Sequence, residues 1–178
     1  PPLNQFFAFS EADILIGRGD YDGAEAATQR GAEMLDQFKL EDLKFLVEMI
    51  QGYIERERGD YPASSAGFRA ALERINHSVI GGSELYRELP RLNAELAESL
   101  VRGGELDQAE KALADGFRLD PSEPLLWDSK ARLQFASGQP ELAQASVSYA
   151  LAIWKDADPE YWSLKQAQSL EKLMMGSE

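Results

Sequence analysis

The chain contains no cysteine and only one histidine, His77, among its 178 residues. A chain without cysteine has no disulfide and no thiolate nucleophile, and one imidazole cannot assemble the ligand sets that zinc and other transition metals prefer. No serine stands out as a partner for His77, and no glycine-rich phosphate loop is present. We therefore expect a protein that is not an enzyme and that uses neither a metal nor a cofactor.

Basic residues are scarce: 18 lysines and arginines face 31 acidic residues, a net charge of −13. The deficit is even, since residues 1–89 carry 9 basic and 16 acidic side chains (−7) and residues 90–178 carry 9 and 15 (−6). A uniformly acidic surface repels phosphate backbones and anionic lipids, and no apolar run is long enough to cross a bilayer. We expect no nucleic-acid partner and no membrane insertion, and nothing in the sequence assigns a compartment.

Length and composition indicate one soluble globular domain over residues 1–178, with 44% hydrophobic and 28% charged residues. The chain begins Pro1-Pro2-Leu3, without an initiator methionine or a signal peptide. We therefore expect a piece of a longer or processed chain.

One turn pattern recurs four times along the chain. A glycine is followed, five residues later, by a small residue, in the pairs Gly19 and Ala24, Gly59 and Ser64, Gly104 and Ala109, and Gly138 and Ala143. Glycine ends a helix where a positive φ is needed, and a small residue lets the next helix approach its partner closely. The pattern predicts helix hairpins whose glycines are 40, 45 and 34 residues apart, with insertions near 38–42 and at 76–89.

The first two turns contain the tripeptide Arg-Gly-Asp, at 18–20 and again at 58–60. This tripeptide is known as a cell-adhesion signal. We interpret it instead as the end of one helix, its glycine stop and the acidic start of the next helix, because the third and fourth turns keep the pattern without the tripeptide.

The repeated segments resemble the tetratricopeptide repeat (TPR) family. Segment 90–123 supplies the family's apolar, small, glycine and proline positions as Leu96, Ala97, Leu100, Gly104, Ala109, Leu113 and Pro121. Segment 124–157 supplies Trp127, Ala131, Gly138, Ala143 and Ala150, but has Lys130 and Gln134 where apolar residues are usual. Repeats at about 5–38 and 43–76 match less well. The resemblance implies an all-α, right-handed superhelix of about four repeats, closed by a capping helix at 158–175 that has Tyr161, Leu164, Leu170 and Leu173 at helical spacing.

In this family the first helix of each repeat lines a concave groove, which is the default binding surface. The resemblance implies a partner-binding set of Phe6, Phe9, Asp13, Met49, Tyr53, Arg56, Arg91, Glu98, Arg102, Asp128 and Arg132. The arginines at 91, 102 and 132 would pair with carboxylates of a bound segment, and the aromatic residues would receive apolar side chains. The Lys and Asn clamp of chaperone-tail-binding TPRs is missing, which disfavours that role.

Three other features have plainer interpretations. Asp156, Asp158 and Glu160 contain oxygens that could hold Mg²⁺, but acidic residues at a helix start are the better account. Residues 76–78 match a glycosylation sequon, which we interpret as polarity of an exposed loop containing His77. The first helix is apolar around much of its circumference, so we expect further repeats, another domain or a second copy of the chain to pack on Phe6, Phe7 and Phe9.

The sequence thus predicts a protein-interaction module that binds a partner peptide or helix in its groove and acts as a scaffold or adaptor of a larger complex. Two alternatives stay open. One is a regulatory or sensor domain of a multidomain signalling or transcription protein, and the other is a small TPR chaperone of the secretion type.

Overall fold

The structure, a computed structural model, describes residues 7–78, 83–159 and 161–176. Within these ranges the chain is helical and has no strand, so the predicted all-α class is confirmed. The chain divides into two compact units, residues 1–88 and 89–178. The predictions of one domain and of a superhelix remain predictions.

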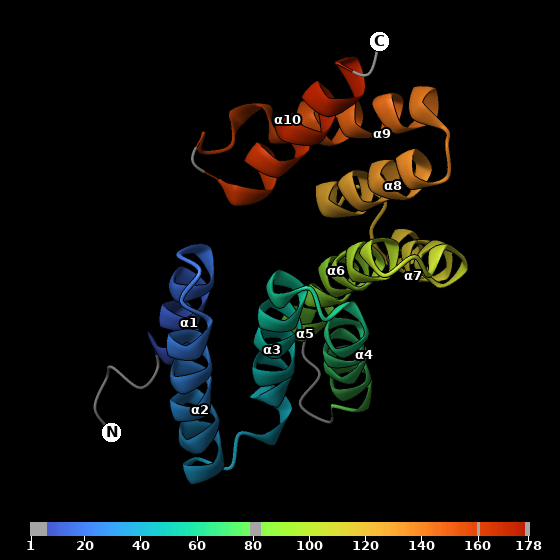
Figure 1. The fold of residues 1–178 in the computed structure, drawn as a ribbon. Helices are drawn as coiled ribbons and strands as arrows, with labels where there is room; N and C mark the ends of the chain where they lie inside the picture. Colours follow the sequence, from blue (N-terminus) through green and yellow to red (C-terminus); the bar gives the residue numbers. More distant parts are fainter. Residues whose placement is uncertain (1–6, 79–82, 160, 177–178) are drawn as a thin grey trace. The chain divides into compact units, whose positions relative to one another are not determined.

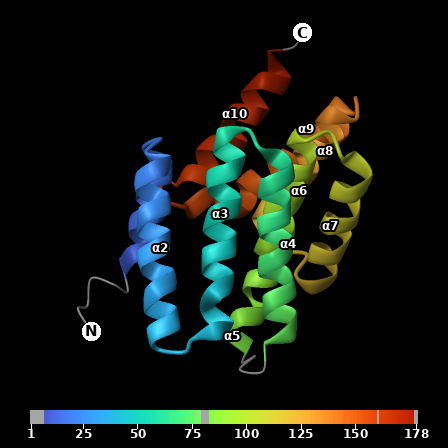
Figure 2. The same ribbon diagram turned by 60° about the horizontal axis from the view of Figure 1, so that its bottom comes forward.

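The N-terminal unit is built from two helix hairpins (Figure 1). Its elements are α1 (Ala8–Gly17), α2 (Tyr21–Gln37), the short 3₁₀ helix η2 (Glu41–Lys44), α3 (Phe45–Arg58), α4 (Tyr61–His77) and the short α5 (Ser83–Tyr86). Helix α1 packs on α2, and α3 lies between α2 and α4 (Figure 2).

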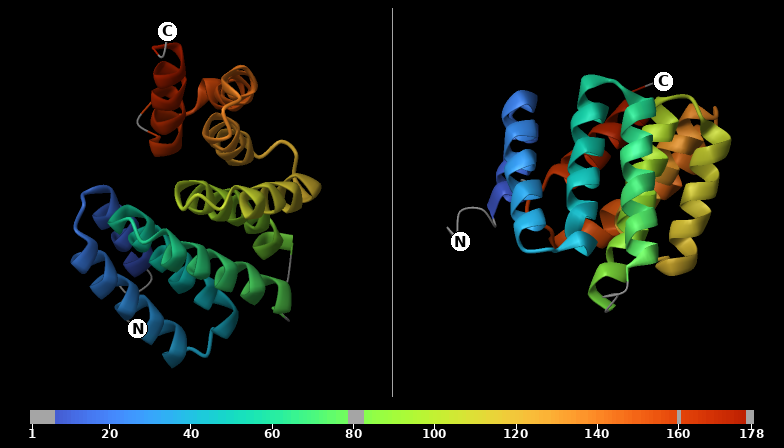
Figure 3. Two further views of the ribbon diagram at one scale, coloured as in Figure 1. Left: turned by 45° about the vertical axis from the view of Figure 1, so that its right-hand side comes forward. Right: turned by 90° about the horizontal axis from the view of Figure 1, so that it is seen from below.

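The C-terminal unit holds two more hairpins and a final helix. Its elements are α6 (Glu88–Arg102), α7 (Leu106–Leu119), α8 (Pro124–Ala136), α9 (Pro140–Ile153), the short 3₁₀ helix η3 (Trp154–Asp156) and α10 (Trp162–Met175). Helices α8 and α9 form a close pair, and α10 packs on α9 (Figure 3). Pro90 lies in the first turn of α6, where its missing N–H costs no helical hydrogen bond.

The four hairpins are closed by the same turn. In each turn the glycine N–H donates to the carbonyl three residues earlier at 2.9–3.0 Å, and the next N–H donates to the carbonyl five residues before it at 2.8–3.0 Å. All four glycines have a positive φ, between +72° and +84°. The predicted glycine stop is confirmed, because only glycine adopts this conformation without steric cost.

The small residue five positions after each glycine is fully buried. Its backbone N–H donates to the carbonyl of the residue that follows the glycine, at 2.9–3.0 Å, and so closes the first turn of the second helix. In the second hairpin this residue is Ser64, whose hydroxyl also donates to the carbonyl of Gly52 at 2.7 Å. The prediction of close helix approach at these positions is confirmed.

Both Arg-Gly-Asp tripeptides form part of a turn between two helices. The carboxylates of Asp20 and Asp60 each accept a backbone N–H three residues later at 3.0 Å, which makes them the N-caps of α2 and α4. Arg58 ends α3 and forms ion pairs with Glu25 and Asp22 on α2. The structural interpretation of the tripeptide is confirmed.

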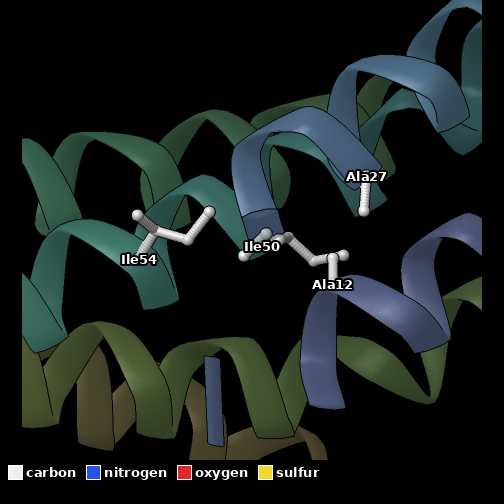
Figure 4. Close-up of a cluster of buried hydrophobic side chains, with 5 residues drawn as sticks. Ala12, Ala27, Ile50 and Ile54 are labelled. Carbon is white, nitrogen blue, oxygen red and sulfur yellow. The ribbon is translucent and has the colours of Figure 1, made fainter. Parts of the chain in front are cut away.

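Small residues also set the packing inside the N-terminal unit. Five buried side chains join α1, α2 and α3 in one cluster, and Figure 4 draws them: Ala12, Ala24, Ala27, Ile50 and Ile54. Gly67 of α4 lies so close to α3 that a Cβ there would be 2.9 Å from the Glu48 carbonyl oxygen.

Three expectations need correction or fall outside the described residues. Asn76 and His77 form the last turn of α4 and do not lie in a loop, because the helix continues past the predicted boundary. Of the apolar residues predicted at helical spacing in the last helix, Leu164 and Leu170 are buried, but Tyr161 and Leu173 are 38% and 57% exposed, and Met174 is buried instead of Leu173. Residues 79–82 of the predicted insertion at 76–89 lie outside the described residues.

Candidate functional site

Most of the predicted binding residues in the N-terminal unit pack within the chain. Phe9 and Met49 lie against the cluster of buried side chains joining α1, α2 and α3. The ring of Tyr53 meets Phe68 edge-on, with 5.2 Å between centroids, and the Arg56 guanidinium lies 5.2 Å from the Tyr53 centroid. These side chains therefore contribute to the unit's own packing.

The rest of that set gives no assembled site. Asp13 is exposed on α1, and Phe6 lies outside the described residues. Phe7 and Ile14 remain 64% and 55% exposed, so they keep the apolar surface that the sequence predicted for this helix. Packing of another chain on this surface stays a prediction.

The C-terminal unit brings four predicted residues together. Glu98 and Arg102 lie on α6, and Asp128 and Arg132 lie on α8. The two helices are tied by a hydrogen bond from the Ser129 hydroxyl to a carbonyl of α6, at 3.0 Å. We name Glu98, Arg102, Asp128 and Arg132 the α6–α8 charge cluster.

Each arginine of this cluster pairs with an acid one turn earlier on its own helix. Arg102 Nη2 lies 2.6 Å from Glu98 Oε1, and Arg132 Nε lies 2.9 Å from Asp128 Oδ2. A longer contact of 3.9 Å joins Arg132 Nε to Glu98 Oε1 and links the helices. The spacing of four residues was visible in the sequence as a helical ion-pair pattern.

The acids are buried and the arginines reach the surface. Glu98 and Asp128 are 6% and 3% exposed, whereas the side chains of Arg102 and Arg132 are 30% and 17% exposed. We expected these arginines to meet carboxylates of a bound segment. Instead, the arginines already pair with carboxylates of the chain itself, and these carboxylates orient the two guanidinium groups.

Burial raises the pKa of Asp128 to about 6. The Arg132 guanidinium lowers this pKa, whereas Glu98 and Glu95 raise it, and the removal of the carboxyl from water is the largest cause. Only Oδ2 is hydrogen bonded; Oδ1 is buried and has no hydrogen-bond partner among the described residues. The cluster thus contains one carboxyl group that changes its charge close to neutral pH.

Sequence reasoning missed two other buried polar residues of α6, Asn93 and Ser99. Asn93 donates to the Leu89 carbonyl at 2.8 Å, and the Ser99 hydroxyl donates to the Glu95 carbonyl at 3.1 Å. No sequence signal marked these two residues. In the structure each side chain donates a hydrogen bond to the backbone carbonyl one helical turn earlier. Arg91 is exposed on the same helix.

The remaining candidate residues are His77 and the acidic residues near position 158. His77 Nδ1 lies 2.8 Å from the Glu73 carbonyl of its own helix. Asp156 and Asp158 are exposed, and position 160 lies outside the described residues. In the parts of the chain that the structure describes, no group of three or more potential ligand side chains could hold a metal ion.

Two further observations concern the whole chain. Over the described ranges, no helix combines the length and the apolar character that a membrane span requires. No family model matches the sequence, and a search of the curated proteins gives no match either.

Proposed function

We propose that this chain is a TPR-like repeat protein that binds a segment of a partner protein without catalysing a reaction, and so acts as a scaffold or adaptor. Four hairpins with the same backbone turn, and a fully buried small residue at the same place in each, support the repeat character. Repeated hairpins of this kind serve as extended binding surfaces in repeat proteins.

The observation that carries the proposal is the α6–α8 charge cluster. Its two guanidinium groups form ion pairs with the buried acids Glu98 and Asp128 and are partly exposed. A donor that is already oriented loses little side-chain entropy when a partner binds. The partner segment therefore presents carboxylates or backbone carbonyls to Arg102 and Arg132.

The test is to capture binding proteins on the immobilised chain, identify them by mass spectrometry and then measure the affinity of the purified partner. Arg102→Gln is expected to weaken binding at least about tenfold, as at an arginine hot spot. The matched control is Arg118→Gln on α7, because Arg118 is also paired with an acid of its own helix, Asp115, and is 77% exposed.

A change of Arg132 to glutamate is a poor test, although charge reversal is the obvious design. The new carboxylate would lie beside the buried Asp128 and Glu98, so loss of binding and loss of folding would be confounded. Equal affinity of the Arg102→Gln variant and the wild type would exclude this surface. Failure of the wild-type chain to capture any partner would reject the proposed function itself.

A further inference from the structure

A groove of about 370 Å³ lies on the C-terminal unit between α7 and α8. Apolar side chains from both helices line it, among them Leu106, Leu113 and Phe117 of α7 and Leu133 of α8. None of these belongs to the α6–α8 charge cluster, so the groove is a separate surface.

The charged residues of the groove lie at opposite ends. Phe117, near the end of α7, meets Trp127, near the start of α8, with 5.0 Å between ring centroids. At the other end of the groove, Leu106 at the start of α7 lies with Ser137 and Gln139 just past the end of α8, so the two helices run antiparallel. Lys130 lies at that end, with its Nζ 4.7 Å from the Trp127 centroid and 5.6 Å from the Phe117 centroid. Asp107 and Glu110 lie nearer the other end, toward the start of α7.

These three charges form no ion pair within the part of the chain that the structure describes. Asp107 and Glu110 are exposed and form no ion pair there, and Lys130 is held over two aromatic rings without a carboxylate partner. Other exposed charges of this unit do form ion pairs, for example Arg118 with Asp115. Among the described residues, the groove therefore has apolar side chains between two unpaired acidic residues at one end and an unpaired lysine at the other.

We propose that this groove binds a short extended peptide segment that carries a basic side chain at one end, a carboxylate at the other and apolar side chains between them. The basic group meets Asp107 and Glu110, and the carboxylate meets Lys130. From Asp107 to Phe117 the helix advances about 15 Å, at about 1.5 Å per residue. An extended peptide covers that length with about five residues, at about 3.5 Å each.

The charges of the groove favour this occupant over others. A second copy of the chain carries the same net charge of −13 and is repelled. A phosphate-rich ligand would satisfy Lys130 but would be repelled by the two acids at the other end. A segment with opposite charges about five residues apart satisfies both ends.

The test is an NMR titration of the isotope-labelled full chain with the probe acetyl-Lys-Leu-Ala-Leu-Ala, which has a free carboxylate. We expect backbone amide shifts concentrated in α7 and α8 along the groove. Amidation of the probe's carboxylate, or replacement of its lysine by glutamate, should each weaken binding about two- to fivefold, as expected for one exposed ion pair.

Chain variants then assign each end of the groove. In Lys130→Gln the free and amidated probes should bind equally, whereas the control Lys155→Gln, at a residue 74% exposed in η3, should keep the preference. In Asp107→Asn/Glu110→Gln the lysine and glutamate probes should bind equally. Both acids are exposed, so this second variant keeps the test valid even if Lys130→Gln lowers the melting temperature.

Three results would overturn the inference: no shifts at millimolar probe, shifts scattered away from the groove, or a carboxylate preference that survives in Lys130→Gln. None of these bears on capture of a partner through Arg102, so failure here and failure of the proposed function are distinguishable.

Discussion

The Nε of Arg132 lies 2.9 Å from the Oδ2 of Asp128, one turn earlier on α8, and this is the only hydrogen bond of that carboxyl group within the described residues. The attraction to the guanidinium does not offset the cost of burial, since the pKa of Asp128 still rises from 3.8 to about 6. One side chain therefore links the stability of the C-terminal unit to pH.

The first prediction is that Asp128→Asn stabilises the protein at pH 7.5. The folded chain binds this proton more tightly than the unfolded chain, so stability falls as pH rises from about 4 to about 6 and stays low above that. The effect is on the order of 2–3 kcal/mol, and asparagine, which has no charge, removes it. Urea unfolding of both proteins at pH 4.5 and 7.5 should show a difference of about 1 kcal/mol at the lower pH and of about 3 kcal/mol at the higher pH.

The control for this experiment is Asp156→Asn, because that carboxyl is 89% exposed. It should leave the pH profile of the wild type unchanged. If the free energy of unfolding of Asp128→Asn had the same pH dependence as that of the wild type, ionisation of Asp128 would not destabilise the folded protein.

The second prediction compares two glycines of one turn. Gly19→Ala forces a side chain into a positive φ of 76° and should cost about 1 kcal/mol. Gly17→Ala lies in the last turn of α1 without a positive φ, so it should be neutral or stabilising by up to about 1 kcal/mol. Neither Cβ would meet another atom within 4 Å, so thermal unfolding of the pair isolates the backbone effect. Equal melting temperatures would contradict it.

The third prediction concerns the aspartate of the second Arg-Gly-Asp. Asp60→Ala removes the N-cap of α4 and should lower stability by about 1 kcal/mol, whereas Asp60→Asn keeps an accepting oxygen and should stay close to the wild type. Chemical unfolding monitored by circular dichroism distinguishes the two variants. If both lose the same stability, the charge of Asp60 matters and its cap hydrogen bond does not.

The fourth prediction tests the close approach of α3 and α4. A Cβ at position 67 would lie 2.9 Å from the Glu48 carbonyl oxygen and 3.1 Å from the Gly52 Cα, and backbone atoms cannot move aside as a side chain can. Gly67→Ala should therefore cost about 1–3 kcal/mol, despite the better helix propensity of alanine. A variant as stable as the wild type would mean that the two helices separate easily.

The turns were predictable because their physics is local. A glycine at positive φ, an aspartate three residues before the N–H that donates to it, and a small residue at a fixed offset are all visible within a few positions of Gly19 or Gly59. The helix ends and the role of Arg-Gly-Asp followed from the same short range. By contrast, the end of α4 at His77 was placed too early, since no glycine or proline marks it.

The burial of individual side chains was not predictable from such local patterns. Helical spacing placed Glu98 and Asp128 on the expected helices, but their burial depends on what α6 and α8 place over them. The same holds for Phe9, which the sequence left available for a partner but which lies against Gly31 of α2. The groove between α7 and α8 involves Lys130 and Gln134, the two positions that departed from the family pattern, yet only tertiary packing reveals an open space there.

Each of the four turns is closed by main-chain hydrogen bonds and by one glycine at positive φ, and this restricts where the sequence can change. Exposed side chains away from the turns can be exchanged without altering the geometry that reverses the chain. Such a scaffold can acquire new ligand preferences by substitution of exposed residues while its bends persist, and the residues least free to change are the four glycines of the turns.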